Sequence, residues 1–330
     1  MNDGRNRESI AIGLSAVAFL VAAAGSLLTF RLEPAPIDGP GSIGQFAAIS
    51  SAVVALVAFG FGRYIVRAKA RPAVLDIIDL SVVALVHGVI ALLTWSLVAS
   101  IAAASFIDAL VYPIPLVMLA GSSAALTAYL VFNSAIRTSL TTLSIVLATF
   151  LAEGIFASML SASDPHWWMK HLSALGMTDD LSALAFNLTL IVAGVMITTL
   201  TRFMTRELPG ATDRGIAQVR TCLALLGVLL ALVGVFPVDE FFWVHTLAAS
   251  GMAIVFMTIA LRVHVWMPDL ARGFVWLGRA FVATTLLIAV FYFVGYYTLT
   301  AVELIAGIMV FTWIVLFLRN AALIAQDAAS

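Results

Sequence analysis

The 330-residue sequence has little charge and a single cysteine, and each scarcity excludes a class of protein. Charged residues make up 11% of the chain and hydrophobic residues 62%, whereas soluble domains are usually about 25% charged and about 45–50% apolar. A chain this apolar cannot cover a folded surface with polar groups, so lipid must be its solvent. One cysteine, Cys222, excludes a disulfide framework and a cysteine-rich metal site, and we interpret it as a small packed apolar residue.

Lysine and histidine are also scarce, which argues against several cofactors. The only lysines, Lys69 and Lys170, lie between apolar runs, so no helix supplies the Schiff-base lysine of a rhodopsin. A two-haem membrane cytochrome needs four histidines within helices, and only His87 and His245 qualify. No phosphate-binding loop is present. We therefore expect no cofactor, and no nucleic-acid partner, because the basic residues are better explained by topology and anionic lipid.

Long apolar runs fill most of the chain. About 20 apolar residues in a helix cross a bilayer core about 30 Å thick, and a spanning segment must satisfy its own backbone hydrogen bonds. The runs lie near residues 10–30, 45–66, 77–101, 109–132, 139–161, 181–201, 217–236, 242–261, 274–295 and 299–319. We expect an all-α polytopic integral membrane protein of about ten transmembrane helices, whose first helix is an uncleaved span.

The basic residues sort to one side of these runs. With a cytoplasmic N-terminus, only Arg31 and Lys170 fall outside, and an even number of spans makes both termini cytoplasmic. The residues expected inside are Arg5, Arg7, Arg63, Arg67, Lys69, Arg71, Arg137, Arg202, Arg206, Arg214, Arg220, Arg262, Arg272, Arg279 and Arg319. The acidic residues expected outside are Glu33, Asp38, Asp108, Asp164, Asp179, Asp180, Asp239, Glu240 and Glu303.

An outer connection at residues 161–180 has a helix-like pattern. Asp164 suits an N-cap, Pro165 the first helical position and Gly176 a C-terminal cap, so we expect a helix of about three turns. One face would be polar and the other apolar, and the helix would lie in the interface. It either closes the outer end of the bundle or contacts a lipid headgroup. The polar stripe is His166, Lys170 and Ser173, and the apolar stripe is Trp168, Leu172 and Leu175.

Two short motif groups carry a family resemblance. The first is Ser163-Asp164-Pro165, Ser173-x-Leu175-Gly176, Phe186-Asn187 and Gly194; the second is Gly234-Val235-Phe236-Pro237, His245 and Ala248-Ala249. Over residues 139–330 the chain resembles the bacterial "domain of unknown function 998" membrane family, which is similar to the FRAG/DRAM-type six-helix proteins. The resemblance implies lipid-linked work by analogy of fold. It divides the chain into a four-helix unit, 1–134, and a six-helix domain, 135–330.

Ionisable residues inside a span are candidates for function by default. Glu153 lies about eight residues from the outer end of its run, and it either binds a cation, relays a proton, accepts a headgroup hydrogen bond or pairs structurally. His87 lies near the middle of its run, where a neutral imidazole bonds a Ser, Thr or Asp on another helix. His245 either ties down a helix end or acts as a ligand.

The leading hypothesis is a non-enzymatic protein of the bacterial plasma membrane that binds or redistributes a lipid at the outer leaflet. The first alternative is a membrane-embedded metal-dependent lipid hydrolase with Glu153, Asp239 and His245 as metal candidates; no His-x-x-x-His pair supports it. The second is a proton- or ion-coupled transporter that relies on Glu153. The candidate ligand or gating residues are Glu153, Asp164, Trp168, His171, Ser173, Asn187, Asp239 and His245.

Overall fold

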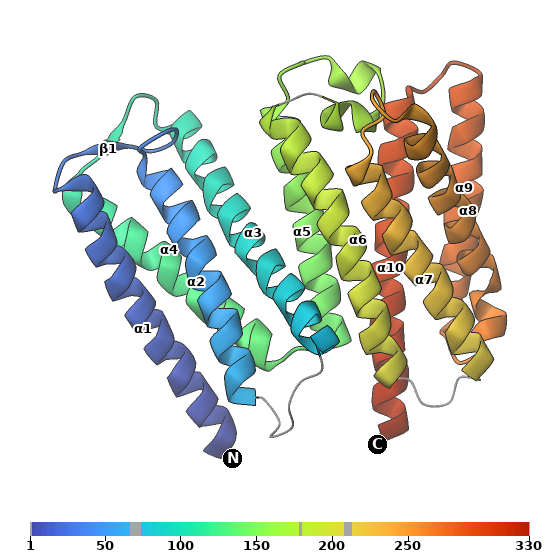
Figure 1. The fold of residues 1–330 in the computed structure, drawn as a ribbon, viewed down its shortest axis with the longest axis horizontal. Coiled ribbons are helices and arrows are strands. Elements are labelled where there is room, and N and C mark those ends of the chain that lie inside the picture. The colour runs from blue at the N-terminus through green and yellow to red at the C-terminus, as the bar shows by residue number, and fades with distance from the viewer. Residues whose placement is uncertain (1, 67–73, 178–179, 208–212, 330) are drawn as a thin grey trace. The chain divides into compact units, whose positions relative to one another are not determined.

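The computed structural model describes residues 2–66, 74–177, 180–207 and 213–329, and it is 85% helical. Within these ranges ten long helices follow one another (Figure 1). Four expected side assignments, those of Arg67, Lys69, Arg71 and Asp179, lie outside the described residues. The helices are α1 (Asn2–Phe30), α2 (Ile43–Val66), α3 (Val74–Ser105), α4 (Pro113–Ile136), α5 (Leu140–Ser161), α6 (Leu181–Glu207), α7 (Asp213–Val235), α8 (Phe242–Trp266), α9 (Arg272–Phe293) and α10 (Leu299–Ala329).

The expected spans are confirmed as helices. In the described part of the chain, ten helices are long and apolar enough to cross a membrane, with mean hydropathy between 1.8 and 2.4. The chain therefore has the architecture of a multi-pass membrane protein. Several helices extend beyond the apolar runs that predicted them; α10, for example, continues to Ala329, whereas its run ends near residue 319.

The start of the fourth run was predicted wrongly. Residues 110–111 form a short strand, β2 (Leu110–Val111), that pairs antiparallel with β1 (Ala35–Pro36). The backbone reverses at Asp108, whose φ is 57°, and α4 begins only at Pro113. Proline suits the first turn of a helix because its missing N–H would have no partner there. Apolar composition alone therefore did not separate strand from helix.

Residues Met1–Thr138 form one compact unit, which we call unit 1. Its helices pack in the order α1, α4, α2, α3, so neighbours in sequence are not always neighbours in space. Small residues allow the close contacts: a side chain at Gly121 would collide with the Phe19 ring, and one at Gly62 with Ala135. Such small residues are typical of membrane helix packing.

Residues Ser139–Ser330 form the second compact unit, unit 2. Each helix from α5 to α10 packs on the next in sequence, and α10 packs back on α5, so the six helices close a ring. Between α6 and α7 the backbones approach so closely at Gly194 and Gly227 that neither position has room for a Cβ atom. Trp313 of α10 is fully buried beside Phe274 and Phe317.

Candidate functional site

The connection from α5 to α6 holds four of the eight candidate ligand or gating residues, Asp164, Trp168, His171 and Ser173. The expected three-turn α-helix over 163–176 is wrong: the chain forms two short 3₁₀ helices, η1 (Trp167–Met169) and η2 (Leu172–Gly176). Between them the backbone turns at Lys170, with φ −96° and ψ −90°. The i, i+4, i+7 stripes proposed from the sequence therefore do not exist as faces of one helix.

Asp164 organises the first half of this connection. One carboxylate oxygen, Oδ1, accepts from the backbone N–H of His166 at 2.8 Å, and the other pairs with Lys170 Nζ at 3.0 Å. These two interactions, the backbone hydrogen bond first, lower the pKa of Asp164. The bonds draw the chain into a tight turn rather than a helix. Trp168 and Met169 stay exposed, at 49% and 60%.

The second half is held by side chains from three different helices. The N–H of Leu172 donates to Glu303 Oε2 of α10 at 2.6 Å. Asn187 Nδ2 of α6 donates to the carbonyl of Gly176 at 3.0 Å. The ring of His245, on α8, lies 3.0 Å from Ser173 Oγ. Residues 171–176 are thus fixed from α6, α8 and α10.

His245 is buried and uses both ring nitrogens. Its Nδ1 lies 2.8 Å from the carbonyl oxygen of Phe236, and its Nε2 faces the Ser173 hydroxyl. A carbonyl oxygen only accepts, so Nδ1 carries the proton, and in the neutral ring Nε2 accepts from the hydroxyl. His245 therefore joins the start of α8, the end of α7 and η2 in one hydrogen-bond chain.

Gly176 ends η2 against α6. A Cβ atom there would lie 2.5 Å from Asn187 Oδ1 and 2.9 Å from the Phe186 ring, so any larger residue displaces one of them. Nearby, the buried Ser182 hydroxyl is within 3.2 Å of the carbonyl of Leu175. The Ser-x-Leu-Gly and Phe-Asn motifs of the sequence thus meet at one contact.

His171 lies half-buried between the two 3₁₀ helices. Burial is the main cause that lowers its pKa, and the nearby His245 and Lys170 act in the same direction. The pKa of His171 therefore lies below the ordinary value of 6.5. The loop places this half-buried imidazole directly after Lys170, which forms the exposed ion pair with Asp164.

Two further sequence candidates lie outside the 163–176 segment. Glu153 is partly buried in α5, eight residues before Ser161, or about 12 Å by helix rise. Asp239 is exposed in the turn between α7 and α8. Over the described ranges, no three His, Cys, Asp or Glu side chains come close enough to hold a metal ion. Glu153, Asp239 and His245 thus do not assemble into such a group.

Glu303 is the residue that the sequence analysis misplaced. It was assigned to an outer loop, yet it lies in α10, in the second turn after Leu299, and its carboxylate binds η2. Its position inside the last apolar run was the available signal. A second overlooked acid, Asp180, accepts from the N–H of Ser163 and of Ala183, so it ties together the two ends of the connection.

Exposed aromatic side chains surround this end of unit 2. They come from the start of α8 and the end of α9, which lie at the same end of unit 2 as the loop (Figure 1). Tryptophan and tyrosine favour the headgroup zone of a bilayer. The exposed residues are Phe241, Phe242, Trp243, Tyr292, Phe293 and Tyr296.

Comparison of the chain with models of protein families, with characterised proteins and with solved structures finds no match. The resemblance to the domain-998 family therefore stays a prediction from the two motif groups.

Proposed function

We propose that this protein binds a membrane lipid at the loop end of unit 2 and acts as a lipid-binding or lipid-redistributing protein rather than as an enzyme. One observation carries the proposal. The 163–176 loop is fixed by Asn187, Glu303 and His245 from three helices, while Trp168 and Met169 on the same loop remain exposed. A fixed polar loop with apolar side chains on its surface suits an amphiphilic ligand.

The chemistry of the loop favours a headgroup. Lys170 and Asp164 form an exposed ion pair, and exposed pairs are worth little in water. A lipid phosphate competes for the lysine at little cost, while Trp168 and Met169 enter the acyl region. The excess of basic residues on the opposite side of the spans supports the outer leaflet as the place of contact.

The test compares two exposed tryptophans at this end of unit 2. The full chain is extracted in mild detergent, and retained lipid is counted by native mass spectrometry and identified by lipidomics. Trp168→Ala is expected to lower the retained lipid at least five-fold, whereas Trp243→Ala, which removes an aromatic outside the loop, leaves it within two-fold. Equal retention by both variants and the native chain would contradict the proposal.

The same sample distinguishes the alternative functions. Stoichiometric zinc, measured by elemental analysis, would favour a metal-dependent lipid hydrolase. Proton-coupled uptake into vesicles that is lost in Glu153→Gln would favour a transporter. The lipid-binding proposal predicts that metal is absent and that Glu153→Gln keeps the bound lipid.

A further inference from the structure

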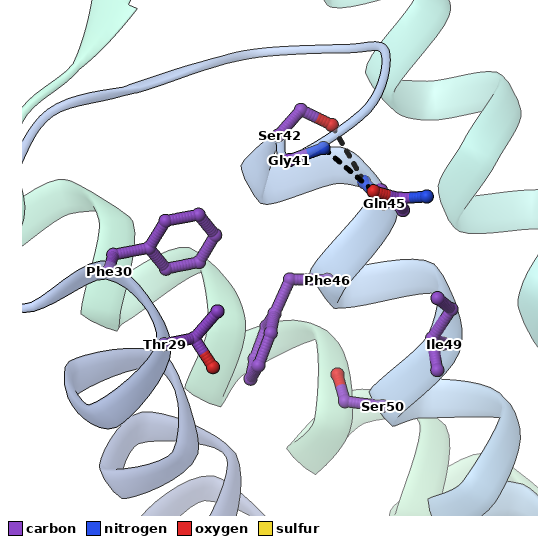
Figure 2. Close-up of a pocket in the computed structure, with 8 residues that line it drawn as sticks. All are labelled: Thr29, Phe30, Gly41, Ser42, Gln45, Phe46, Ile49 and Ser50. Atoms are coloured by element: carbon purple, nitrogen blue, oxygen red, sulfur yellow. Dashed lines mark hydrogen bonds between the residues drawn. The ribbon is translucent and has the colours of Figure 1, made fainter.

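Unit 1 contains a groove that belongs to a different part of the molecule from the loop described above. It lies between the last turn of α1 and the first turns of α2 and has a volume of about 430 Å³ (Figure 2). This is within the range of about 300–1,000 Å³ typical of small-molecule sites. The groove exists because α1 packs along α4 and hardly touches α2. Its lining residues are Thr29, Phe30, Gly41, Ser42, Gln45, Phe46, Ile49 and Ser50.

The groove changes character along its length. At the helix end, Ser42 and Gln45 form a polar margin: Ser42 Oγ accepts from the N–H of Gln45, and Gln45 Oε1 accepts from the N–H of Gly41. Further down α2 the wall is mostly apolar, and its two hydroxyls, those of Thr29 and Ser50, donate to carbonyls of their own helices. The rings of Phe30 and Phe46 meet edge to face with centroids 5.7 Å apart, and Ile49 is 53% exposed (Figure 2).

The polar margin still offers hydrogen-bond donors. The oxygens of Ser42 and Gln45 are used as acceptors at the start of α2, and Ser42 is buried, so the exposed amide group of Gln45 is the donor that a ligand meets. No charged side chain lines the groove. The matching ligand has uncharged acceptor oxygens at one end and an apolar chain at the other.

The position of the groove along α2 indicates which class of ligand it binds. The groove extends roughly 12 Å along α2, from Ser42 to Ser50, by helix rise. If α2 spans a bilayer, the groove therefore runs from the helix end to the depth of the hydrocarbon core. An acyl chain in the groove gains dispersion contacts with Phe30, Phe46 and Ile49. We propose that this groove holds one acyl chain and the glycerol–ester region of a membrane glycerolipid.

The neighbouring sequence indicates how the headgroup is distinguished. Arg31 follows Phe30 directly, in a left-handed turn with φ 50°, and it is exposed. A phosphate on the same glycerol lies beyond the polar margin, on the side where α1 ends. An anionic phospholipid therefore gains from Arg31, whereas uncharged diacylglycerol binds through the groove alone.

The experiment maps lipid contacts on the full chain in lipid nanodiscs. Phosphatidylglycerol or diacylglycerol carrying a photoreactive diazirine on one acyl chain is activated, and the labelled peptides are sequenced by mass spectrometry. Labelling is expected to concentrate at residues 29–30 and 41–50. Ser50→Phe fills the groove and is expected to reduce this labelling at least five-fold. Val57→Phe, at a 62%-exposed position deeper on α2, leaves it unchanged.

Three outcomes overturn the proposal: labelling spread evenly along α2, labelling unaffected by Ser50→Phe, or equal losses in the Ser50 and Val57 variants. If Ser50→Phe does not fold, Thr29→Phe fills the groove from α1 and gives the same test. Arg31→Gln is expected to lower labelling by phosphatidylglycerol about three-fold and leave diacylglycerol unchanged. Because the groove lies in unit 1, Trp168→Ala leaves its labelling intact, so this site and the loop site fail separately.

Discussion

The two units use membrane helices in opposite ways. In unit 2 the helices follow sequence order around a closed ring, and the polar loop between α5 and α6 is bound to α6 and α10. In unit 1 the order is α1, α4, α2, α3, which leaves a groove between α1 and α2. The comparison teaches that helix order decides where a unit has an open surface: unit 2 carries a fixed loop at one end of its ring, and unit 1 has a groove along the side of α2.

Buried histidines illustrate the same contrast with identical chemistry. His87 in unit 1 bonds the carbonyl of Val83 at 2.7 Å and Ser134 Oγ at 2.9 Å. His245 in unit 2 bonds the carbonyl of Phe236 and Ser173 Oγ. His87 thereby links α3 and α4, which confirms the sequence expectation of a Ser, Thr or Asp partner on another helix. His245 instead fixes a loop, so its removal is expected to have local consequences that removal of His87 lacks.

The largest effect is expected where helix backbones touch. Gly194→Ala inserts a methyl group against Gly227 and Ala231 of α7, and overpacking of this kind costs about 1–3 kcal/mol. Gly307→Ala, in α10 with open space around it, is expected to raise stability by up to about 1 kcal/mol through helix propensity. Thermal unfolding in detergent measures both. A midpoint that rises in the Gly194 variant would contradict the close packing of the ring.

Next in size is the loss of a buried histidine. His245→Ala leaves the Phe236 carbonyl and the Ser173 hydroxyl without their partner, at a cost of about 2–3 kcal/mol. The loop is then expected to open locally, so that trypsin cuts after Lys170 at least ten-fold faster. The fragment is identified by mass.

His87→Ala is the matched control for that experiment. It removes an equivalent pair of hydrogen bonds from unit 1 and is expected to lower overall stability without faster cleavage at Lys170. If trypsin cuts after Lys170 equally fast in both variants, the hydrogen bonds of His245 do not fix the loop.

A smaller effect is expected at Glu303. In Glu303→Gln the amide oxygen still accepts from the N–H of Leu172, so stability is expected to fall by less than about 1 kcal/mol. Glu303→Ala removes the acceptor and is expected to speed cleavage at Lys170 about three- to five-fold. Equal cleavage rates in the alanine variant and the native chain would show that the Glu303 hydrogen bond does not hold η2.

The smallest effect is expected from pH. The pKa of His171 is lowered in the folded chain, so its contribution is fully present above the ordinary value of 6.5 and is lost as pH falls through the folded value. Lowering the pH from 7.5 to 5.5 is expected to reduce the thermal midpoint by no more than about 2 °C, since the ring is half-exposed. His171→Gln should remove that part of the pH dependence; an unchanged dependence would point to other groups.

The sequence predicted features that depend on local patterns, and it did not predict features that depend on residues far apart in the chain. Apolar run length predicted all ten helices, because backbone hydrogen bonding in hydrocarbon leaves no alternative. The loop was predicted as an α-helix from Asp164, Pro165 and Gly176, and this prediction failed because distant partners, Glu303 and Asn187, hold its backbone. Capping patterns carry no information about such partners.

The groove between α1 and α2 could not be predicted from the sequence for a related reason. The groove forms because α1 packs on α4 and not on α2, the next helix in the sequence. The apolar composition of the helices does not predict which of them pack together. By contrast, the bonding of His87 to a serine was predictable, because a buried imidazole in a helix bundle has few other neutral partners.

The most direct measurement captures what lies against the loop in the membrane itself. Trp168→benzoylphenylalanine places a photoreactive ketone at an exposed loop position, and illumination of cell membranes links it to its neighbour. The lipid-binding account predicts a single glycerolipid adduct by mass, with several-fold less adduct when the same residue replaces Trp243. A protein adduct, or equal lipid labelling at both positions, would contradict the account.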